Sequence, residues 1–480
     1  MIAPEPEESP LPTCQLWVGV PGLTTIASDE MLGDIMRLST IHETLERAER
    51  HLSAIAQRST GAPEEAGAFA DLNLVVATIR PIRDAAEKLG TSLTTAIQTY
   101  SSAEVENHAL LDFGSTLSLG GLGALFGLSP LLSIPGLHQV VGGPLLQKIV
   151  EVGLATPSDV RASDMKTHAS VDALISNEQL ILALRYLIEN SDVAIRASGG
   201  DQAALLSQLE SQGITGVAAT AAIAAFYASQ VKALQEGPVS VRKTATETNA
   251  APTGYAQNGQ AIPNEESSPG GAQMRVDTIH TPGAADKHVI YLGGTGDFSL
   301  VPGGNAFDMT SNVNAIAGFP AGAIEGIKEA LKKQGISSLD EIQIWGHSQG
   351  GLLAAVIAES EQYNVTSLVT LGAPVGNISI PTDINAVLVE NLEDLVPATG
   401  GIQHNTSATN VLCDAFAPGE ALPAGLSFPG HQMATYNKTL IAMDLAESPQ
   451  IIEAAEKIGA FSNGATTVTS NYYRIDRVEP

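Results

Sequence analysis

Residues 343–351 read Gln-Ile-Trp-Gly-His-Ser-Gln-Gly-Gly. An alternating apolar run precedes this motif, and a helix-forming run, residues 352–358, follows it. A strand, a sharp turn and a helix in this order place the serine of a Gly-x-Ser-x-Gly motif at the top of a sheet, with its hydroxyl accessible. Gly346 and Gly350 suit such a turn, because a Cβ at either position would crowd the strand against the helix. The pattern predicts that Ser348 is a nucleophile, and the alternative is a glycine-rich turn whose serine has no chemical role.

Length, charge and cysteine content limit the classes of protein that this chain can belong to. Its 480 residues predict two or three domains. The net charge of −28 argues against a nucleic-acid partner and against an anionic membrane surface. Residues 1–12 are acidic and proline-rich, so no secretory signal peptide is expected. The two cysteines, Cys14 and Cys413, either form a disulfide or are unrelated thiols, and the second alternative is favoured.

The N-terminal half, residues 1–236, is predicted to be all-helical. Ser28 is followed by two acids, which is typical of a helix start. Residues 59–65 contain a Gly and a Pro that end one helix and begin the next. Two long helices joined by a short turn predict an antiparallel hairpin over about residues 28–111.

Two long stretches without charged residues follow the hairpin, at residues 113–147 and 211–231. Each is long enough to span a bilayer. The first is interrupted by Pro130 and Pro135, and the second consists mostly of Ala, Thr, Ser and Gln, which enter lipid weakly. We therefore expect buried helices of a helical domain, and a membrane-inserting hairpin is the alternative.

The C-terminal half is predicted to be an α/β domain. Residues 237–272 are rich in Pro and Gly and have no periodicity, which predicts a linker or an extended surface segment and a domain boundary. Residues 273–480 then alternate strands with helices, which predicts a doubly wound, mostly parallel sheet. The predicted strands are at residues 273–279, 288–292, 341–345, 367–371 and 386–390.

An acyl-transfer serine requires an orienting acid, and this acid follows the serine in the expected fold. Asp394 lies in the loop after the strand at 386–390, where active sites of open parallel sheets are found. Asp394 is therefore the predicted acid. Glu390 and Glu393 are the competing candidates. Asp383 is less suitable, because it precedes that strand and falls at its other end.

The same mechanism requires a general base, and two histidines, His404 and His431, lie downstream of Asp394. His431 is in a loop directly before a helical run, a placement that suits the base, so His431 is predicted and His404 is the alternative. His347, beside the serine, is expected to pack at the turn.

Backbone amides are the expected donors to a developing oxyanion. One should come from Gln349, directly after the serine, and the other from Gly294 or Thr295, in the loop after the strand at 288–292. A phosphate-binding loop is the rival interpretation. It is the weaker one, because no lysine follows and neither nucleotide fingerprint is matched. No metal and no cofactor is predicted.

Four motifs resemble those of the α/β-hydrolase superfamily, in its lipase/esterase-like branch: residues 293–295, 346–350, 394–397 and 430–431. The resemblance covers about residues 273–470. It implies an α/β-hydrolase fold and a Ser–Asp–His serine hydrolase that cleaves an ester or thioester of a small molecule or lipid without a cofactor. Peptidase and acyltransferase chemistry use the same residues and stay open. The alternative function is a non-enzymatic secreted or toxin-like protein with a vestigial hydrolase fold, which engages partners or membranes.

The end of the predicted hairpin carries a second resemblance. Tyr100 and Glu104 lie one turn apart on one helix face. A helical hairpin ending in this pair resembles the WXG100-like substrates of the actinobacterial type VII (ESX) secretion system, in which the tyrosine and the acid form part of the export signal. The Trp-x-Gly of that family is absent from the hairpin turn. The resemblance implies contact with that machinery and an extracellular or cell-surface location without a signal peptide. The alternatives are a core tyrosine beside a solvated acid and a cytoplasmic protein.

Overall fold

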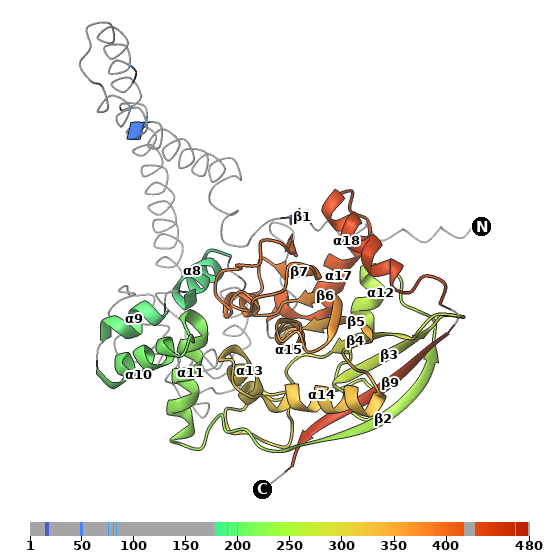
Figure 1. The fold of residues 1–480 in the computed structure, drawn as a ribbon, viewed down its shortest axis with the longest axis horizontal. Helices are drawn as coiled ribbons and strands as arrows, with labels where there is room; N and C mark the ends of the chain where they lie inside the picture. Colours follow the sequence, from blue (N-terminus) through green and yellow to red (C-terminus); the bar gives the residue numbers. More distant parts are fainter. Residues whose placement is uncertain are drawn as a thin grey trace, which may run out of the picture. The chain divides into compact units, whose positions relative to one another are not determined.

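The structure, a computed structural model, divides into two compact units, Met1–Val20 with Phe113–Pro480 and, separately, Pro21–Asp112 (Figure 1). Five positions of the second unit are described, and all are helical: Glu49, Arg50, Val75, Arg80 and Arg83. In the first unit the described residues are 15–18, 176, 178–189, 191–198, 200–416, 428–465 and 467–478.

In the unit Pro21–Asp112, an ion pair links two helical positions that are distant in sequence. Glu49 Oε1 accepts hydrogen bonds from Arg80 Nε at 2.9 Å and from Arg80 Nη2 at 2.8 Å. Arg83 also binds the Glu49 carboxylate. The rest of the hairpin predicted over residues 28–111 lies outside the described residues, and so do Tyr100 and Glu104.

A nine-stranded mixed sheet organises the other unit, with strand order β1-β8-β7-β6-β5-β4-β3-β9-β2. The five strands from β4 to β8 are parallel to one another; four of them were predicted and β8 was not. Antiparallel strands flank them on both sides. The bounds are β1 Gln15–Val18, β2 Val239–Asn249, β3 Met274–His280, β4 Lys287–Leu292, β5 Glu341–His347, β6 Asn364–Leu371, β7 Asn385–Asn391, β8 Thr409–Asp414 and β9 Thr467–Arg477.

Helices cover both faces of this sheet, because alternate residues of each buried strand point to opposite sides. Ile342 and Ile344 of β5 face a core formed with α14 (Gly322–Gln334) and α15 (Gln349–Glu359). Trp345 faces the opposite core, formed with α12 (Gly254–Ala261), α17 (Met433–Asp444) and α18 (Pro449–Ala460). The described part of this unit is therefore α/β in character, as predicted.

Residues 237–272 do not form a linker, and part of the segment is extended, as the alternative prediction had it. Residues Val239–Asn249 form β2, which pairs with β9 along the edge of the sheet. The next segment forms α12, whose Tyr255 is 1% exposed in the core. The strand is polar because it has a neighbour on one side only and no fully buried face. The Pro and Gly residues mark the ends of short elements rather than a flexible join.

The predicted domain boundary near residue 237 was also wrong. Four helices before it pack with elements after it in one apolar cluster (Figure 1): α8 (Glu178–Glu189), α9 (Ser191–Ser198), α10 (Gly200–Ser211) and α11 (Gly216–Ser229). Their partners are Met309 and Val313 of α13 (Met309–Ile316) and Leu395 and Ala398 of α16 (Leu395–Ala398). These helices and the sheet are parts of one compact unit.

Helix α11 accounts for most of the second uncharged stretch, and it is a core helix. Residues such as Ile223, which is fully buried, place it inside the apolar cluster. Among the residues that the structure describes, no helix combines the length and apolar character required to cross a membrane. The first uncharged stretch, residues 113–147, lies outside the described residues.

Cys413, in β8, is disulfide-bonded. The sequence contains one other cysteine, Cys14, which lies outside the described residues. Strand β1, directly after Cys14, pairs antiparallel with β8, and Leu16 is opposite Cys413. The favoured expectation of two unrelated thiols is therefore wrong for Cys413.

Candidate active site

Ser348 lies in the turn between β5 and α15, as its motif predicts, and its backbone has φ 55° and ψ −123°. A positive φ is uncommon for a residue with a side chain and often marks a functional turn. The glycines on either side are required by space. A Cβ on Gly346 would lie 2.3 Å from the carbonyl carbon of Gly350, and a Cβ on Gly350 would lie 2.2 Å from the carbonyl oxygen of Leu292.

The structure brings Ser348, Asp394 and His431 together in one hydrogen-bonded chain. His431 Nε2 lies 2.8 Å from Ser348 Oγ, and His431 Nδ1 lies 2.7 Å from Asp394 Oδ2. Asp394 follows the carboxyl end of β7, and His431 ends the short 3-10 helix η2 (Pro429–His431). The imidazole can therefore accept the serine proton while the carboxylate stabilises the charge that forms on the ring.

The Asp394 carboxylate is fully buried and accepts three hydrogen bonds. His431 and the Tyr436 hydroxyl both donate to Oδ2, each at 2.7 Å, and the Val396 amide donates to Oδ1 at 2.9 Å. Burial, followed by the Asp394 charge, raises the pKa of Tyr436 well above its ordinary value, so its hydroxyl keeps its proton and donates. Tyr436 was not among the predicted site residues, although this tyrosine lies in the helical run after His431.

Substitution of Tyr436 by phenylalanine is expected to lower kcat/KM for an ester by about tenfold. The ring is kept, but the buried Asp394 carboxylate loses one of its three donors and is positioned less firmly against His431. Steady-state hydrolysis of a chromogenic ester measures the loss. Tyr255→Phe is the control, because the buried Tyr255 hydroxyl donates to the Ile451 carbonyl at 2.9 Å. A kcat/KM in Tyr436→Phe equal to that of Tyr255→Phe would contradict this role.

His347 supports the backbone of His431. Its Nε2 lies 2.9 Å from the His431 carbonyl oxygen, which can only accept, so Nε2 carries the proton and donates. The two rings lie 4.7 Å apart between centroids. Burial, and then the nearby charge of His431, lowers the pKa of His347 to about 3. His347 therefore stays neutral above about pH 3, and the hydrogen bond persists there.

The loop after β4 lies beside the serine, because Leu292 pairs with Gly346 in the parallel register. A Cβ on Gly294 would lie 3.4 Å from the Ser348 Cβ, in ordinary contact. Within the described residues, the amides of Gly294 and Thr295 have no hydrogen-bond acceptor. The amide of Gln349, the first residue of α15, has no acceptor within its helix. The predicted oxyanion residues therefore offer unused N–H groups around Ser348.

The side chain of Gln349 links this loop to the start of α15, a contact that the sequence analysis missed. Gln349 Nε2 donates to the Asp308 carbonyl at 2.9 Å. The Asp308 carboxylate caps α13 through the Ser311 amide, and Arg477 Nη2 donates to its Oδ1 at 3.0 Å. Glu236 accepts from the same guanidinium at 2.7 Å. Burial raises the pKa of Asp308, and the Arg477 charge opposes that shift. The network anchors the loop that carries Gly294 and Thr295.

The competing candidates lie outside this hydrogen-bonded chain. The Arg185 guanidinium binds Glu390 at 2.6 Å and the Gly401 carbonyl at 3.0 Å, with both side chains buried. His404 Nε2 lies 2.9 Å from Glu189 Oε1, on α8. Asp383 precedes β7 and lies at its amino-terminal end, whereas Asp394 follows the carboxyl end of the same strand. None of these three residues takes part in the chain formed by Ser348, His431 and Asp394.

Glu393 belongs to a cluster of carboxylates next to this chain. Its oxygens accept from the amides of Ala415 and Phe416, each at 3.2 Å. Carboxylate oxygens of Glu178, Glu393 and Asp414 lie within 4.8 Å of one another, which is the spacing of a cation site. Burial, followed by a hydrogen bond with Asp414, raises the pKa of Glu393. Glu393 can therefore hold a proton and donate it to Asp414.

Comparisons with protein-family models, with curated proteins and with solved structures returned no match. Function must therefore be inferred from the geometry of the site.

Proposed function

We propose that this protein is a serine hydrolase of the carboxylic-ester type, with an α/β-hydrolase fold. The observation that carries the proposal is the position of His431, whose two ring nitrogens lie 2.8 Å from Ser348 Oγ and 2.7 Å from Asp394 Oδ2. Serine, acid and histidine follow one another in the chain order of that fold. The strained backbone of Ser348 and the unused amides beside it support the same mechanism.

In the proposed reaction, Ser348 Oγ attacks the acyl carbon while His431 Nε2 removes its proton. The amide of Gln349, with that of Gly294 or Thr295, stabilises the oxyanion. His431 then returns the proton to the leaving alcohol or thiol, and an acyl-enzyme remains on Ser348. Water, activated by the same histidine, releases the acid in the second half of the reaction.

An ester or thioester of a small molecule or lipid is the proposed substrate. Apolar side chains of α13 and α16, among them Met309 and Leu395, belong to the cluster formed with helices α8 to α11. Leu395 directly follows Asp394, so this apolar cluster begins next to the triad. Met309 and Leu395 are buried against helices α8 to α11, so they form a packed interior next to the triad, and the proposed ester class rests on the chemistry of the triad.

A fluorophosphonate probe tests the nucleophile directly, because it forms a covalent bond only with an activated serine. We expect the full-length protein to be labelled and Ser348→Ala to lose essentially all labelling. Ser207→Ala, at an exposed serine of α10, is the matched control and should be labelled like the wild type. Labelling of Ser348→Ala at the wild-type level would overturn the assignment.

We also propose that the protein is exported. A disulfide at Cys413 is typical of proteins that leave the reducing cytoplasm. The pair Tyr100 and Glu104 is the proposed export signal for type VII secretion machinery. A Tyr100→Ala variant with an unchanged extracellular fraction in the native host would contradict that route.

A further inference from the structure

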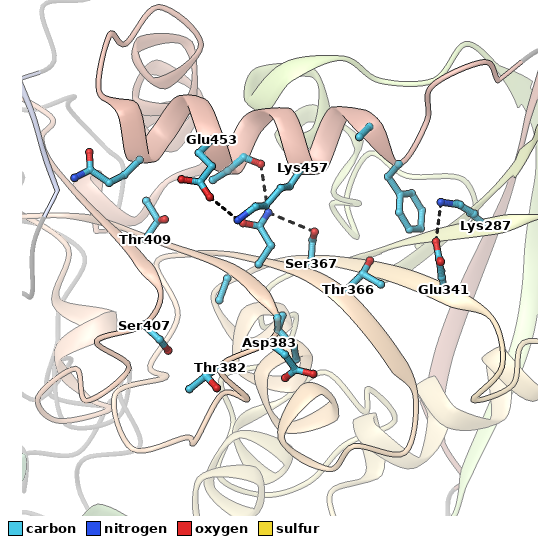
Figure 2. Close-up of a pocket in the computed structure, with 17 residues that line it drawn as sticks. Lys287, Glu341, Thr366, Ser367, Thr382, Asp383, Ser407, Thr409, Glu453 and Lys457 are labelled. Carbon is cyan, nitrogen blue, oxygen red and sulfur yellow. Dashed lines mark hydrogen bonds and ion pairs between the residues drawn. The ribbon is translucent and has the colours of Figure 1, made fainter.

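A polar groove of about 600 Å³ lies between α18 and the amino-terminal edge of the parallel strands (Figure 2). Glu341, the first residue of β5, lines it, whereas Ser348 follows the last residue of the same strand. The length of the strand, roughly 20 Å, therefore separates the groove from the catalytic triad. A ligand in this groove would not touch the triad.

Neutral hydrogen-bonding side chains form the largest group in the lining, beside charged and apolar ones. Five hydroxyl groups come from the strands and the loops before them: Thr366, Ser367, Thr382, Ser407 and Thr409. Asn385 lies among them and is held in place, since its Nδ2 donates to the Ala454 carbonyl at 3.3 Å and to Ser367 Oγ at 3.5 Å (Figure 2). These contacts join β6 and β7 to α18. The floor of the groove is therefore preorganised rather than assembled on binding.

The charges of the groove do not favour an anion. Both lysines are already paired, Lys287 with Glu341 at 2.7 Å and Lys457 with Glu453 at 2.8 Å. Lys287 also lies 5.0 Å above the Phe461 ring, which covers that aromatic face. A phosphate or carboxylate ligand would meet carboxylates and no free cation among the described lining residues.

Asp383 is the carboxylate that remains available. It is exposed, it lines the groove, and no hydrogen bond or ion pair joins it to another described residue. It lies in the loop that leads into β7, two positions before Asn385. A carboxylate beside an amide can accept from neighbouring hydroxyl groups of a ligand while the amide accepts or donates.

We propose that this groove binds a neutral oligosaccharide. Hydroxyl and amide side chains both donate and accept, and they match ligand hydroxyl groups, which do the same. The groove exposes more polar than apolar surface, which disfavours a lipid, and its paired lysines disfavour nucleic acid and phosphate. The inference does not rest on the proposed function. Binding to a glycan through this groove would leave the carboxyl ends of the parallel strands, where Ser348 lies, accessible.

Titration of the full-length protein with neutral and acidic oligosaccharides tests the proposal. The neutral probes are hexamers of glucose and of N-acetylglucosamine, and the acidic probe is a galacturonate hexamer. We expect a neutral hexamer to bind in the millimolar range or tighter, by calorimetry, and the acidic hexamer to bind at least about tenfold more weakly. Asp383→Ala should weaken the neutral ligand by about tenfold, the loss of one charged hydrogen bond.

A bulky substitution locates the ligand. Ser407→Trp, at an exposed position, should fill the groove and reduce affinity at least about tenfold. Thr248→Trp, exposed on the edge strand β2, is the matched control and should bind like the wild type. Thermal unfolding confirms that both variants are folded. Absence of binding by every neutral hexamer, tighter binding of the acidic one, or binding that Ser407→Trp leaves unchanged would each overturn the proposal.

Discussion

Replacement of His431 by alanine is expected to lower kcat/KM for an ester substrate by about 10⁴- to 10⁶-fold. The reason is geometric, because His431 is the group that contacts both Ser348 Oγ and Asp394 Oδ2. Without it, the serine hydroxyl has no acceptor for its proton and the leaving group has no donor. Steady-state hydrolysis of a chromogenic ester measures the loss.

His404→Ala is the matched control for this experiment. His404 is the other histidine downstream of Asp394, and it is bound to Glu189 on the protein surface. Its removal should leave kcat/KM within about twofold of the wild type, as for a surface substitution remote from the site. His347 stays neutral above about pH 3, so it carries no charge in an assay near neutral pH. Loss of activity in His404→Ala with activity retained in His431→Ala would reverse the assignment.

Breaking the buried pair between Arg185 and Glu390 is expected to cost about 3–5 kcal/mol of unfolding free energy. Arg185→Met leaves the Glu390 carboxylate buried without its cation. Burial already raises the pKa of Glu390, and Arg185 opposes that shift, so the variant should raise it further. A raised folded-state pKa means that stability is lost as pH rises above the ordinary value of 4.5. The deficit should therefore be larger near pH 8 than near pH 5.

Denaturant unfolding of Arg185→Met, Glu390→Met and the double variant measures this interaction. The double variant should recover much of the loss, because no unpaired charge then remains in the interior. Lys457→Ala is the control, since its partner Glu453 lies at a similar distance, 2.8 Å, but both side chains are mostly exposed. That change should cost at most about 1 kcal/mol. Equal losses in Arg185→Met and Lys457→Ala would contradict a structural role for the buried pair.

Most of the central strands and the three hydrogen-bonded residues Ser348, Asp394 and His431 could be predicted from sequence, because their signals are local. Ser348 is marked by Gly346 and Gly350, because the turn that contains the serine leaves no room for a Cβ at either position. Asp394 and His431 follow from chain order and from their positions next to predicted elements. For the candidate base, His404 and His431 both remained. In the structure His404 contacts Glu189, whereas His431 contacts Ser348.

The supporting residues could not be predicted, because their partners are remote in the chain. Tyr436 is separated by 42 positions from Asp394, and Arg477 by 169 positions from Asp308. Neither residue has a neighbour in sequence that indicates such a contact. Strand β2 was missed for a related reason. Its pairing partner, β9, lies far from it in the chain. Pairing with β9 stabilises an extended conformation that the polar sequence of β2 does not indicate.

The packing of helices α8 to α11 against α13 and α16 decides where this protein can be cut. A fragment that began at residue 237 would keep Ser348, Asp394 and His431, yet it would expose Met309, Val313, Leu395 and the other apolar residues that these helices cover. It would also leave Glu390 buried without its partner, Arg185. Such a fragment is expected to aggregate rather than fold, since exposed apolar surface of this kind promotes self-association. The smallest portion with a complete interior must therefore include the helices from Glu178 onward.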